Sequence, residues 1–360
     1  MTSGNKKVLI AMSGGLDSSV AALLLQSQGY ELTGVTFIPY ESISQACLEK
    51  QTGCCNADTI FEAGKLAAKL GFEHKIIDVR DTFRETVVKN FTSEYMHGRT
   101  PNPCVLCNKL IKWGVLSLEA EKNGCSFIAT GHYARIGNSG ENYFLQKGTD
   151  LSKDQSYFLW MLTSENLCRT LFPLGNMTKN EVREIARKNG FTKIADRRES
   201  QEVCFIPDNN YRRFLAEELS SLPGEGDIRD INGKIIGKHK GFPFYTIGQR
   251  KGLQVATGQP VYVVSIDSNT NTIILGSKNH LLAKKTQLEN AVFNTKLIIG
   301  KTYTVKIRYR TPGVKANLTI EDGKYIINFM EEAYAITPGQ SAVVYDDIDV
   351  IGGGIIAKID

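Results

Sequence analysis

Short apolar runs alternate with amphipathic segments from Lys7 to about Thr130. The runs are rich in β-branched residues and have the length of strands: VLIAM, LTGVTFI, HKIIDV and SFIAT. Between them, residues 17–28 and 57–70 place apolar side chains at helical spacing. A glycine follows each of these two segments, as is typical of a helix end. Strands that alternate with helices predict a parallel sheet covered by helices.

A further helix is predicted in the segment TKNEVREIARKNG. It begins with Thr178, and Glu181 follows three residues later, which is the spacing of a capping box. Gly190 predicts the end of the helix, because glycine readily adopts the left-handed conformation found there. We expect this helix to complete the α/β region.

The character of the sequence changes after about Asp208, where glycine and proline become frequent. Residues 212–219 are the last stretch with a helical period. From about Val261 onward, alternating apolar and polar positions predict strands in VYVVSID, YTVKIRYR and KYIINF. Asp322 and Gly323 are typical of a tight hairpin turn. This pattern predicts a small domain followed by a β-barrel.

A chain of 360 residues is more than twice as long as a typical domain. We therefore predict an α/β domain over residues 1–208, a small, mainly β central domain over 209–276 and a β-barrel over 277–360. With 42% hydrophobic and 22% charged residues, the composition is that of a globular protein. It argues against a disordered chain and against a coiled coil.

No segment approaches the roughly 20 consecutive apolar residues that a bilayer crossing requires. The early run from Val8 to Met12 is also shorter than the apolar core of a secretory signal. We therefore expect a cytoplasmic protein that does not associate with a membrane. The net charge of +5, from 43 basic and 38 acidic side chains, permits a polyanionic partner without identifying one.

A glycine loop lies between the first predicted strand and the first predicted helix, in AMSGGLDS from Ala11 to Ser18. Backbone N–H groups at such a helix start can hold an anion, and Gly14 and Gly15 allow it to approach closely. The loop lacks the lysine of a Walker motif and does not match the dinucleotide-binding pattern. Asp17 as a simple helix cap is the alternative, and the strand-loop-helix context favours a nucleotide site.

The eight cysteines are too sparse for a secreted disulfide scaffold, so they are expected to be free, metal-bound or catalytic. Cys104 and Cys107 lie in TPNPCVLCN, before a helix-like stretch whose start favours the thiolate form. Cys204 lies in RRESQEVCFI, after a basic and polar stretch. The C-x-x-C pair alone leaves zinc, a redox dithiol and two unrelated thiols open. A four-ligand zinc site would need partners such as Cys54 or Cys55.

Seven motifs distributed along almost the whole chain resemble those of one family. The glycine loop resembles the PP-loop of the N-type ATP pyrophosphatases. The motifs are AMSGGLDSSV, TPNPCVLCN, ATGHYAR, KDQSYFLW, QEVCFIP, YTIGQRKGL and TPGQSAVVY. Together they resemble the tRNA-specific 2-thiouridylase (MnmA or TrmU) family. The resemblance implies a Rossmann-like PP-loop domain of the adenine nucleotide alpha hydrolase type, followed by the small β domain and the β-barrel.

The resemblance also implies an activity and its partners. Members of the family use ATP with Mg²⁺ to adenylate the 2-carbonyl oxygen of the wobble uridine in a tRNA anticodon. Sulfur from a cysteine persulfide then gives 2-thiouridine, AMP and pyrophosphate, the reaction of a tRNA-uridine 2-sulfurtransferase. Cys204 matches the residue that carries the persulfide, and Cys107 matches the nucleophile that helps release sulfur and leaves a disulfide. A sulfur-relay protein or a cysteine desulfurase is the implied donor.

Further site residues follow from the resemblance by position. The positions that match ATP contacts are Ala11, Met12, Ser13, Gly14, Gly15, Leu16, Asp17, Ser18, Phe37 and Gly131. The positions that match contacts with the target base or the tRNA are Asn102, Pro103, Cys104, His132, Lys153, Asp154, Gln155, Arg308, Tyr309 and Gln340. The residues themselves add that Lys306, Arg308 and Arg310 fall on one face of a predicted strand, where they can neutralise phosphates or form a solvated charged face.

Several alternatives remain open. Many relatives carry aspartate at the position of Cys104, so Cys104, Cys107 and Cys204 together can also be interpreted as the ligands of a [4Fe-4S] cluster. A PP-loop synthetase that adds nitrogen, such as an argininosuccinate or GMP synthetase, would need no cysteine pair. A module that only binds tRNA and holds zinc would not turn over ATP. A histidine after a strand is usually packed, so we expect a structural or tRNA-contacting role for His132 rather than acid–base catalysis.

Overall fold

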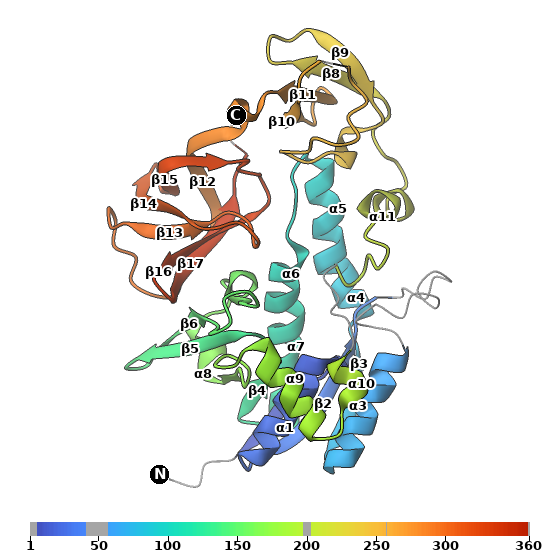
Figure 1. Cartoon of the computed structure of the whole chain (residues 1–360), viewed down its shortest axis with the longest axis vertical. Helices are drawn as coiled ribbons and strands as arrows, with labels where there is room; N and C mark the ends of the chain where they lie inside the picture. Colours follow the sequence, from blue (N-terminus) through green and yellow to red (C-terminus); the bar gives the residue numbers. More distant parts are fainter. Residues whose placement is uncertain (1–5, 41–56, 197–202, 257, 359–360) are drawn as a thin grey trace. The chain divides into compact units, whose positions relative to one another are not determined.

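The computed structural model describes residues 6–40, 57–196, 203–256 and 258–358 (Figure 1). The chain divides into two compact units. Unit 1 comprises Met1–Val87, Cys104–Asn209 and Ile348–Val350. Unit 2 comprises Val88–Pro103, Asn210–Asp347 and Ile351–Asp360. Cys47, Cys54 and Cys55 lie outside the described residues, and so does the zinc alternative that draws on Cys54 or Cys55.

Unit 1 is built on a five-stranded sheet in the order β3-β2-β1-β4-β7. The strands are β1 (Lys7–Ala11), β2 (Glu31–Ile38), β3 (Glu73–Asp78), β4 (Phe127–Ala129) and β7 (Thr170–Leu171). Every pairing between them is parallel. The predicted parallel sheet is therefore confirmed. The carboxyl ends of parallel strands share one edge, which is where such sheets bind ligands.

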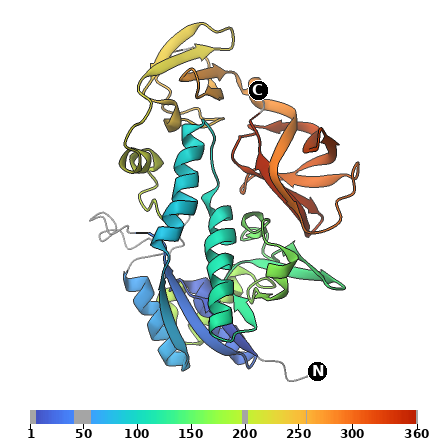
Figure 2. The same ribbon diagram turned by 180° about the vertical axis from the view of Figure 1, so that it is seen from behind.

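Helices pack on one face of this sheet around a shared buried cluster. They include α1 (Leu16–Ser27), α3 (Ala57–Leu70), α9 (Lys179–Lys188) and the short α10 (Thr192–Ala195). Val8 and Ile10 of β1 pack with Leu25 of α1, Leu66 of α3 and Val182 of α9 in one buried cluster. Figure 1 shows α9 in front of the sheet, and Figure 2 shows the opposite side. No helix among the described residues has both the length and the apolar character needed to cross a membrane.

A continuous helical segment runs from residue 103 to residue 122. It consists of α6 (Pro103–Leu106), the wider π-helical turns η2 (Cys107–Trp113) and α7 (Gly114–Lys122). Buried Trp113 donates its indole N–H to Thr170 Oγ1 at 2.8 Å. Figure 2 shows this segment in front of the sheet, on the face opposite α9. The helix therefore includes Cys104 and Cys107, which were predicted to precede it, because Pro103 suits a first helical position.

Other elements complete unit 1 and the start of unit 2. Unit 1 also contains the hairpin of β5 (Ala134–Ser139) and β6 (Asn142–Lys147), and the short helices η3 (Ser156–Phe158) and α8 (Ser164–Cys168). A second helical segment consists of α4 (Arg80–Phe83), η1 (Arg84–Val88) and α5 (Lys89–Met96). In unit 2, α5 packs against α11 (Tyr211–Glu218) through Phe91 and Phe214, whose ring centroids are 5.8 Å apart.

Unit 2 contains a four-stranded sheet and a closed barrel. The sheet has the order β10-β11-β8-β9 and is formed by β8 (Gly226–Asp230), β9 (Ile235–His239), β10 (Tyr262–Asp267) and β11 (Thr272–Gly276). The short helices η4 (Phe242–Phe244) and η5 (Lys278–Leu281) flank it along the chain. Ile228, Phe242, Val263 and Ile273 form its core. This part of the chain is mainly β, as predicted.

Six strands form the barrel, in the order β12-β15-β14-β13-β16-β17, and the pairing of β12 with β17 closes it. They are β12 (Leu282–Phe293), β13 (Tyr303–Lys306), β14 (Val314–Glu321), β15 (Lys324–Tyr334), β16 (Ser341–Asp346) and β17 (Asp349–Ile356). Asp322 and Gly323 have φ values of 49° and 74° and connect β14 to β15. The positive φ at both positions is that of the predicted hairpin turn, which is confirmed.

The helix that begins after Thr178 has the predicted capping box. The Thr178 hydroxyl accepts from the Glu181 N–H, and the Glu181 carboxylate accepts from the Thr178 N–H at 2.7 Å. Gly190, with φ +80°, lies just beyond its end as expected. These bonds satisfy two N–H groups that a helix start leaves unpaired.

Replacing Thr178 with alanine should lower the free energy of unfolding by about 1 kcal/mol, because the Glu181 N–H loses its acceptor. Urea denaturation of the two proteins measures the difference. Thr178→Ser is the matched control, since it keeps the hydroxyl and should stay close to the unmodified chain. Equal stability of all three proteins would contradict the capping role.

Candidate functional site

Two glycines, one in the loop between β1 and α1 and one after β4, allow this loop to pack closely against its neighbours. Gly14 has φ +68°, and a Cβ there would lie 2.0 Å from the Thr59 carbonyl oxygen. A Cβ on Gly131, just after β4, would lie 2.8 Å from the Ser18 nitrogen and from the carbonyl carbon of Asp17. The loop is thus pressed between α3 and the residues after β4, and any side chain at these points would displace its backbone.

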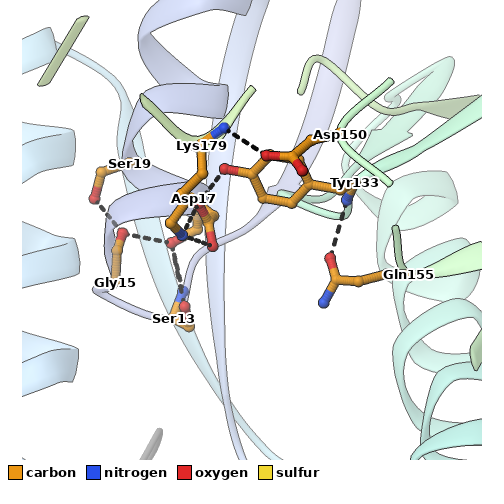
Figure 3. Close-up of polar contacts among 9 residues, drawn as sticks. Ser13, Gly15, Asp17, Ser19, Tyr133, Asp150, Gln155 and Lys179 are labelled. Atoms are coloured by element: carbon orange, nitrogen blue, oxygen red, sulfur yellow. Dashed lines mark hydrogen bonds and ion pairs between the residues drawn. The ribbon is translucent and has the colours of Figure 1, made fainter. Parts of the chain in front are cut away.

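Serine hydroxyls hold this loop from within. Ser18 Oγ accepts from the Ser13 N–H at 3.1 Å, and Ser19 Oγ donates to the Gly15 carbonyl at 2.8 Å (Figure 3). Within the described part of the chain, the N–H groups of residues 14–18 donate to no protein acceptor. Free N–H groups at the positive end of α1 make this loop a suitable anion site.

The Asp17 carboxylate lies at the first turn of α1 and binds two partners from distant segments. Its Oδ1 accepts from the Tyr133 hydroxyl at 2.8 Å. The Lys179 ammonium contacts Oδ1 at 2.8 Å and Oδ2 at 3.0 Å (Figure 3). The Lys179 side chain is only 7% exposed, whereas that of Asp17 is 36% exposed. Asp17 is therefore more than a helix cap, since its side chain caps no N–H of α1.

Lys179 is fixed by the start of its own helix. It is the first residue of α9, and its backbone N–H donates to Asp150 Oδ2 at 3.1 Å. Hydrogen bonds from the Ser152 hydroxyl and from the Lys179 N–H lower the pKa of Asp150. A lysine at the first position of a helix is disfavoured by the helix dipole. Lys179, Tyr133 and Asp150 were not predicted as site residues, and the unfavourable helix position of Lys179 is the sequence signal that could have identified it.

Two further residues predicted to contact ATP lie where β1 and β2 end. Met12 is 2% exposed and packs in the core of unit 1. Its N–H donates to the Val35 carbonyl at 2.8 Å, which ties the end of β1 to β2. Phe37 lies further along β2 and is half-buried. Unit 1 thus brings the glycine loop, Gly131 and Asp17 together, as expected from the sequence.

Residues 153–155 lie beside Tyr133, and Gln155 fixes the backbone of Tyr133. Gln155 Oε1 accepts from the Tyr133 N–H at 2.9 Å, and the Gln155 N–H donates to the Tyr133 carbonyl at 2.8 Å. Asp154 is 4% exposed and accepts from the N–H groups of Gly148 and Ser156. Lys153 is half-buried. Asp154 and Gln155 therefore position the neighbouring loops in this structure.

His132 is buried and neutral. Its Nδ1 lies 2.7 Å from Thr130 Oγ1, and its Nε2 lies 3.3 Å from the Lys112 ammonium. Burial, and then the charge of Lys112, hold the pKa of His132 well below 6.5. The Trp113 ring packs against the imidazole, with centroids 5.7 Å apart. These contacts agree with the expectation of a packed histidine.

The candidate catalytic cysteines occupy two segments of unit 1. Cys104 is exposed in the first turn of the helix that begins at Pro103, and Cys107, one turn later, is half-buried. Cys204 is half-buried and is followed by Phe205, whose ring packs on Phe83 at a centroid distance of 5.4 Å. None of the three forms a disulfide in this structure.

The cluster alternative finds no fitting geometry. Among the described residues, no group of three or more histidine, cysteine, aspartate or glutamate side chains is arranged to hold a metal ion. Cys104, Cys107 and Cys204 are all described, so they are not gathered as cluster ligands in this conformation. We therefore derive no step through an iron–sulfur cluster.

Two residues expected to contact tRNA make internal bonds in unit 2. Gln340 donates its side-chain N–H groups to the carbonyls of Thr100 at 2.9 Å and Pro101 at 3.1 Å. These bonds fix the segment of Thr100 and Pro101, which leads to Asn102 and Pro103. Arg308 Nη2 donates to the carbonyls of Ile247 and Ala335 and to the Thr337 hydroxyl.

The predicted strand face of Lys306, Arg308 and Arg310 is wrong. Strand β13 ends at Lys306, and the chain bends before Arg308 and turns at Tyr309 and Arg310. The cause is non-local, because the acceptors of the Arg308 guanidinium come from residues 27 or more positions away. The Lys306 ammonium lies 5.8 Å from the centre of the Tyr309 ring.

Three protein-family models match successive parts of the chain. Residues 6–208 match the tRNA methyl transferase HUP domain, 212–277 the tRNA methyl transferase PRC-barrel domain and 283–356 the aminomethyltransferase beta-barrel domain. The chain is 46% identical over 362 residues to the tRNA-specific 2-thiouridylase MnmA of Amoebophilus asiaticus, covering 97% of this chain and 95% of the relative. The protein of the same name from Cytophaga hutchinsonii is 43% identical, with 97% of both chains covered.

Gly131→Ala should reduce nucleotide affinity by about tenfold or more, because its Cβ would push the backbone of Asp17 and Ser18 out of position. Equilibrium titration with ATP and Mg²⁺ measures the effect. Gly64→Ala is the matched control, since a Cβ there meets only His74 Nδ1, at an ordinary 3.6 Å. Unchanged ATP affinity in Gly131→Ala would show that the close approach does not shape the loop.

His132 should make the protein less stable in acid. Because its folded pKa lies well below 6.5, the unfolded chain binds a proton as pH falls through 6.5 while the folded chain does not. The free energy of unfolding therefore falls below pH 6.5, by about 1.4 kcal/mol per pH unit. Urea denaturation between pH 7.5 and about pH 5 should show a shallower decline for His132→Gln. Parallel declines in the two proteins would contradict burial of a neutral imidazole.

Proposed function

We propose that this chain, which belongs to the tRNA-specific 2-thiouridylase MnmA family, uses ATP to replace the 2-oxygen of the tRNA wobble uridine with sulfur. The observation that carries the proposal is that unit 1 contains both a glycine loop whose N–H groups at residues 14–18 have no acceptor in the described chain and a helix start that carries cysteines. The loop supplies a site for the ATP phosphates, and the thiols supply a sulfur nucleophile. The enzyme would thus be a tRNA-uridine 2-sulfurtransferase.

Adenylation is the first step. The uridine 2-oxygen attacks the α-phosphorus of ATP, the bond from that phosphorus to the bridging oxygen breaks, and pyrophosphate leaves with the electron pair. The uridine N3 proton is lost to water. A carbonyl oxygen is a poor leaving group, and its adenylate is a much better one. We assign the phosphates to the loop of residues 11–18 and Mg²⁺ to Asp17, whose carboxylate is a ligand of the type that Mg²⁺ prefers.

Sulfur transfer is the second step. The terminal sulfur of a persulfide on Cys204 attacks C2 of the base, and AMP leaves. The Cys107 thiolate then attacks the inner sulfur of Cys204, which releases 2-thiouridine, reprotonated at N3 or sulfur, and leaves a Cys107–Cys204 disulfide. A thiol reductant restores the two cysteines, and a sulfur-relay protein or cysteine desulfurase reloads Cys204.

For tRNA, we propose direct contacts from Asn102, Pro103, Cys104, Lys153 and Tyr309. His132, Asp154, Gln155, Arg308 and Gln340 would act by positioning these segments, as their internal bonds support. We also propose the three domains 1–208, 209–276 and 277–360. Phe37 and Gly131 complete the nucleotide site in this proposal.

Purified enzyme with ATP, Mg²⁺, a persulfide donor and unmodified tRNA transcript should form 2-thiouridine, with AMP and pyrophosphate. Cys107→Ser and Cys204→Ser should each abolish thiolation, because serine can neither carry nor accept the sulfane sulfur. Both variants should still bind tRNA. Nucleoside mass spectrometry measures the product, and a filter-binding titration measures tRNA affinity.

Cys168→Ser is the matched control, because Cys168 is an exposed free thiol of unit 1 outside the proposed chemistry. It should retain full thiolation. Normal 2-thiouridine formation by either Cys107→Ser or Cys204→Ser would refute the assigned roles. ATP turnover without thiolated product from the unmodified enzyme would favour a synthetase that adds another group.

A further inference from the structure

We propose that Cys104 is a resolving thiol: it opens the Cys107–Cys204 disulfide left by each round of sulfur transfer and moves that disulfide onto the Cys104–Cys107 pair. The inference rests on the proposed function, in which each round ends with the Cys107–Cys204 disulfide. This disulfide must be opened before Cys204 can carry sulfur again. Cys104 thereby gains a chemical role in addition to its proposed contact with the tRNA.

The disulfide of the proposed reaction is difficult for an external reductant to reach. Both of its sulfurs belong to half-buried residues, Cys107 and Cys204. A reducing thiolate must attack one sulfur of the disulfide directly, so the rate depends on access as well as on thiolate character. Cys104, by contrast, is exposed. A disulfide that includes Cys104 therefore offers the reductant an accessible sulfur.

Cys104 and Cys107 lie one helical turn apart. Cys104 is the second residue of α6, and Cys107 begins the η2 turns of the same continuous helical segment. Side chains three positions apart on a helix are neighbours, with about 5–6 Å between their Cβ atoms. A disulfide needs a Cβ separation of about 3.5–4.5 Å, so the two residues must approach each other by about 1 Å.

The start of this helix is suited to that adjustment. Pro103 has no N–H, and the first N–H groups of a helix have no intrahelical acceptor, so few backbone bonds restrain the first turn. Cys107 begins a wider π-helical turn, a form that is frequent at functional sites. The helix start also favours the thiolate form of Cys104, which is the form that attacks a disulfide.

The exchange itself needs no co-reactant. The Cys104 thiolate attacks Sγ of Cys107, the bond between Cys107 and Cys204 breaks, and Cys204 leaves with the electron pair as a thiolate. Cys204 is thereby reduced, Cys104 is oxidised, and the new disulfide joins Cys104 to Cys107. A dithiol reductant then opens this exposed disulfide, becomes a disulfide itself and returns both cysteines as thiols.

Tryptic peptides distinguish the two disulfides. Cleavage after Arg99 and Lys109 places Cys104 and Cys107 in one peptide, whereas Cys204 lies in the peptide of residues 199–212. Enzyme preloaded with persulfide completes one round of thiolation without reductant, is quenched in acid and is alkylated. The peptide of residues 100–109 should then be lighter than its reduced, unalkylated form by two hydrogen atoms, because it contains the internal disulfide.

In Cys104→Ser protein, each 2-thiouridine formed should instead leave the two peptides joined through Cys107 and Cys204. Cys168→Ser removes an exposed thiol elsewhere in unit 1 and is the matched control, so it should give the peptide pattern of the unmodified enzyme. Joined peptides from the unmodified enzyme, with Cys104 alkylated, would overturn the inference.

A second measurement separates this inference from the proposed function. Cys204→Ser protein, without ATP or tRNA, is equilibrated with mixtures of reduced and oxidised glutathione. The peptide of residues 100–109 should acquire its internal disulfide, whereas Cys104→Ser in the same background should form only a mixed disulfide with glutathione. If Cys204→Ser also forms only mixed disulfides, the inference is wrong. Closure of the pair in an enzyme that makes no 2-thiouridine would contradict the proposed function alone.

Discussion

The Asp17 carboxylate is the point at which the candidate nucleotide site is held together. It receives hydrogen bonds from Tyr133, which follows β4, and from Lys179, which begins α9. The loop that carries it must also pass close to Thr59 and Gly131 without any side chain in between. A buried ammonium is stable only beside such a partner, so the folding of unit 1 and the charge balance of the site depend on the same ion pair.

This arrangement explains why serine and glycine dominate the loop. The hydroxyls of Ser18 and Ser19 form hydrogen bonds with backbone groups of the loop itself. The N–H groups of residues 14–18 remain available for an external anion. The cysteine helix of the same unit presents Cys104 and Cys107 in its first two turns. In unit 2, Gln340 fixes the segment of Thr100 and Pro101 that precedes that helix. The proposed phosphate site and the cysteine helix are therefore held by separate sets of hydrogen bonds.

Features set by neighbouring residues could be predicted from the sequence. The capping box of Thr178 and Glu181, the turn of Asp322 and Gly323 and the parallel strands all follow from local pattern. The barrel and the membership of the family also followed, because the motifs extend along the whole chain. Lys179 could not be predicted as a partner of Asp17, since the pair forms only when α9 packs beside α1. Arg308 was misplaced for the same reason, because its acceptors come from Ile247, Ala335 and Thr337.

If the loop directs AMP onto the 2-oxygen of the wobble uridine, an isotope label on that oxygen will be found in AMP. A tRNA transcript carrying oxygen-18 at that carbonyl would be thiolated by the purified enzyme, and the products would be analysed by mass spectrometry. The heavy oxygen should appear in the phosphate of AMP, in proportion to the 2-thiouridine formed. Label found in pyrophosphate, inorganic phosphate or water, with unlabelled AMP, would contradict it.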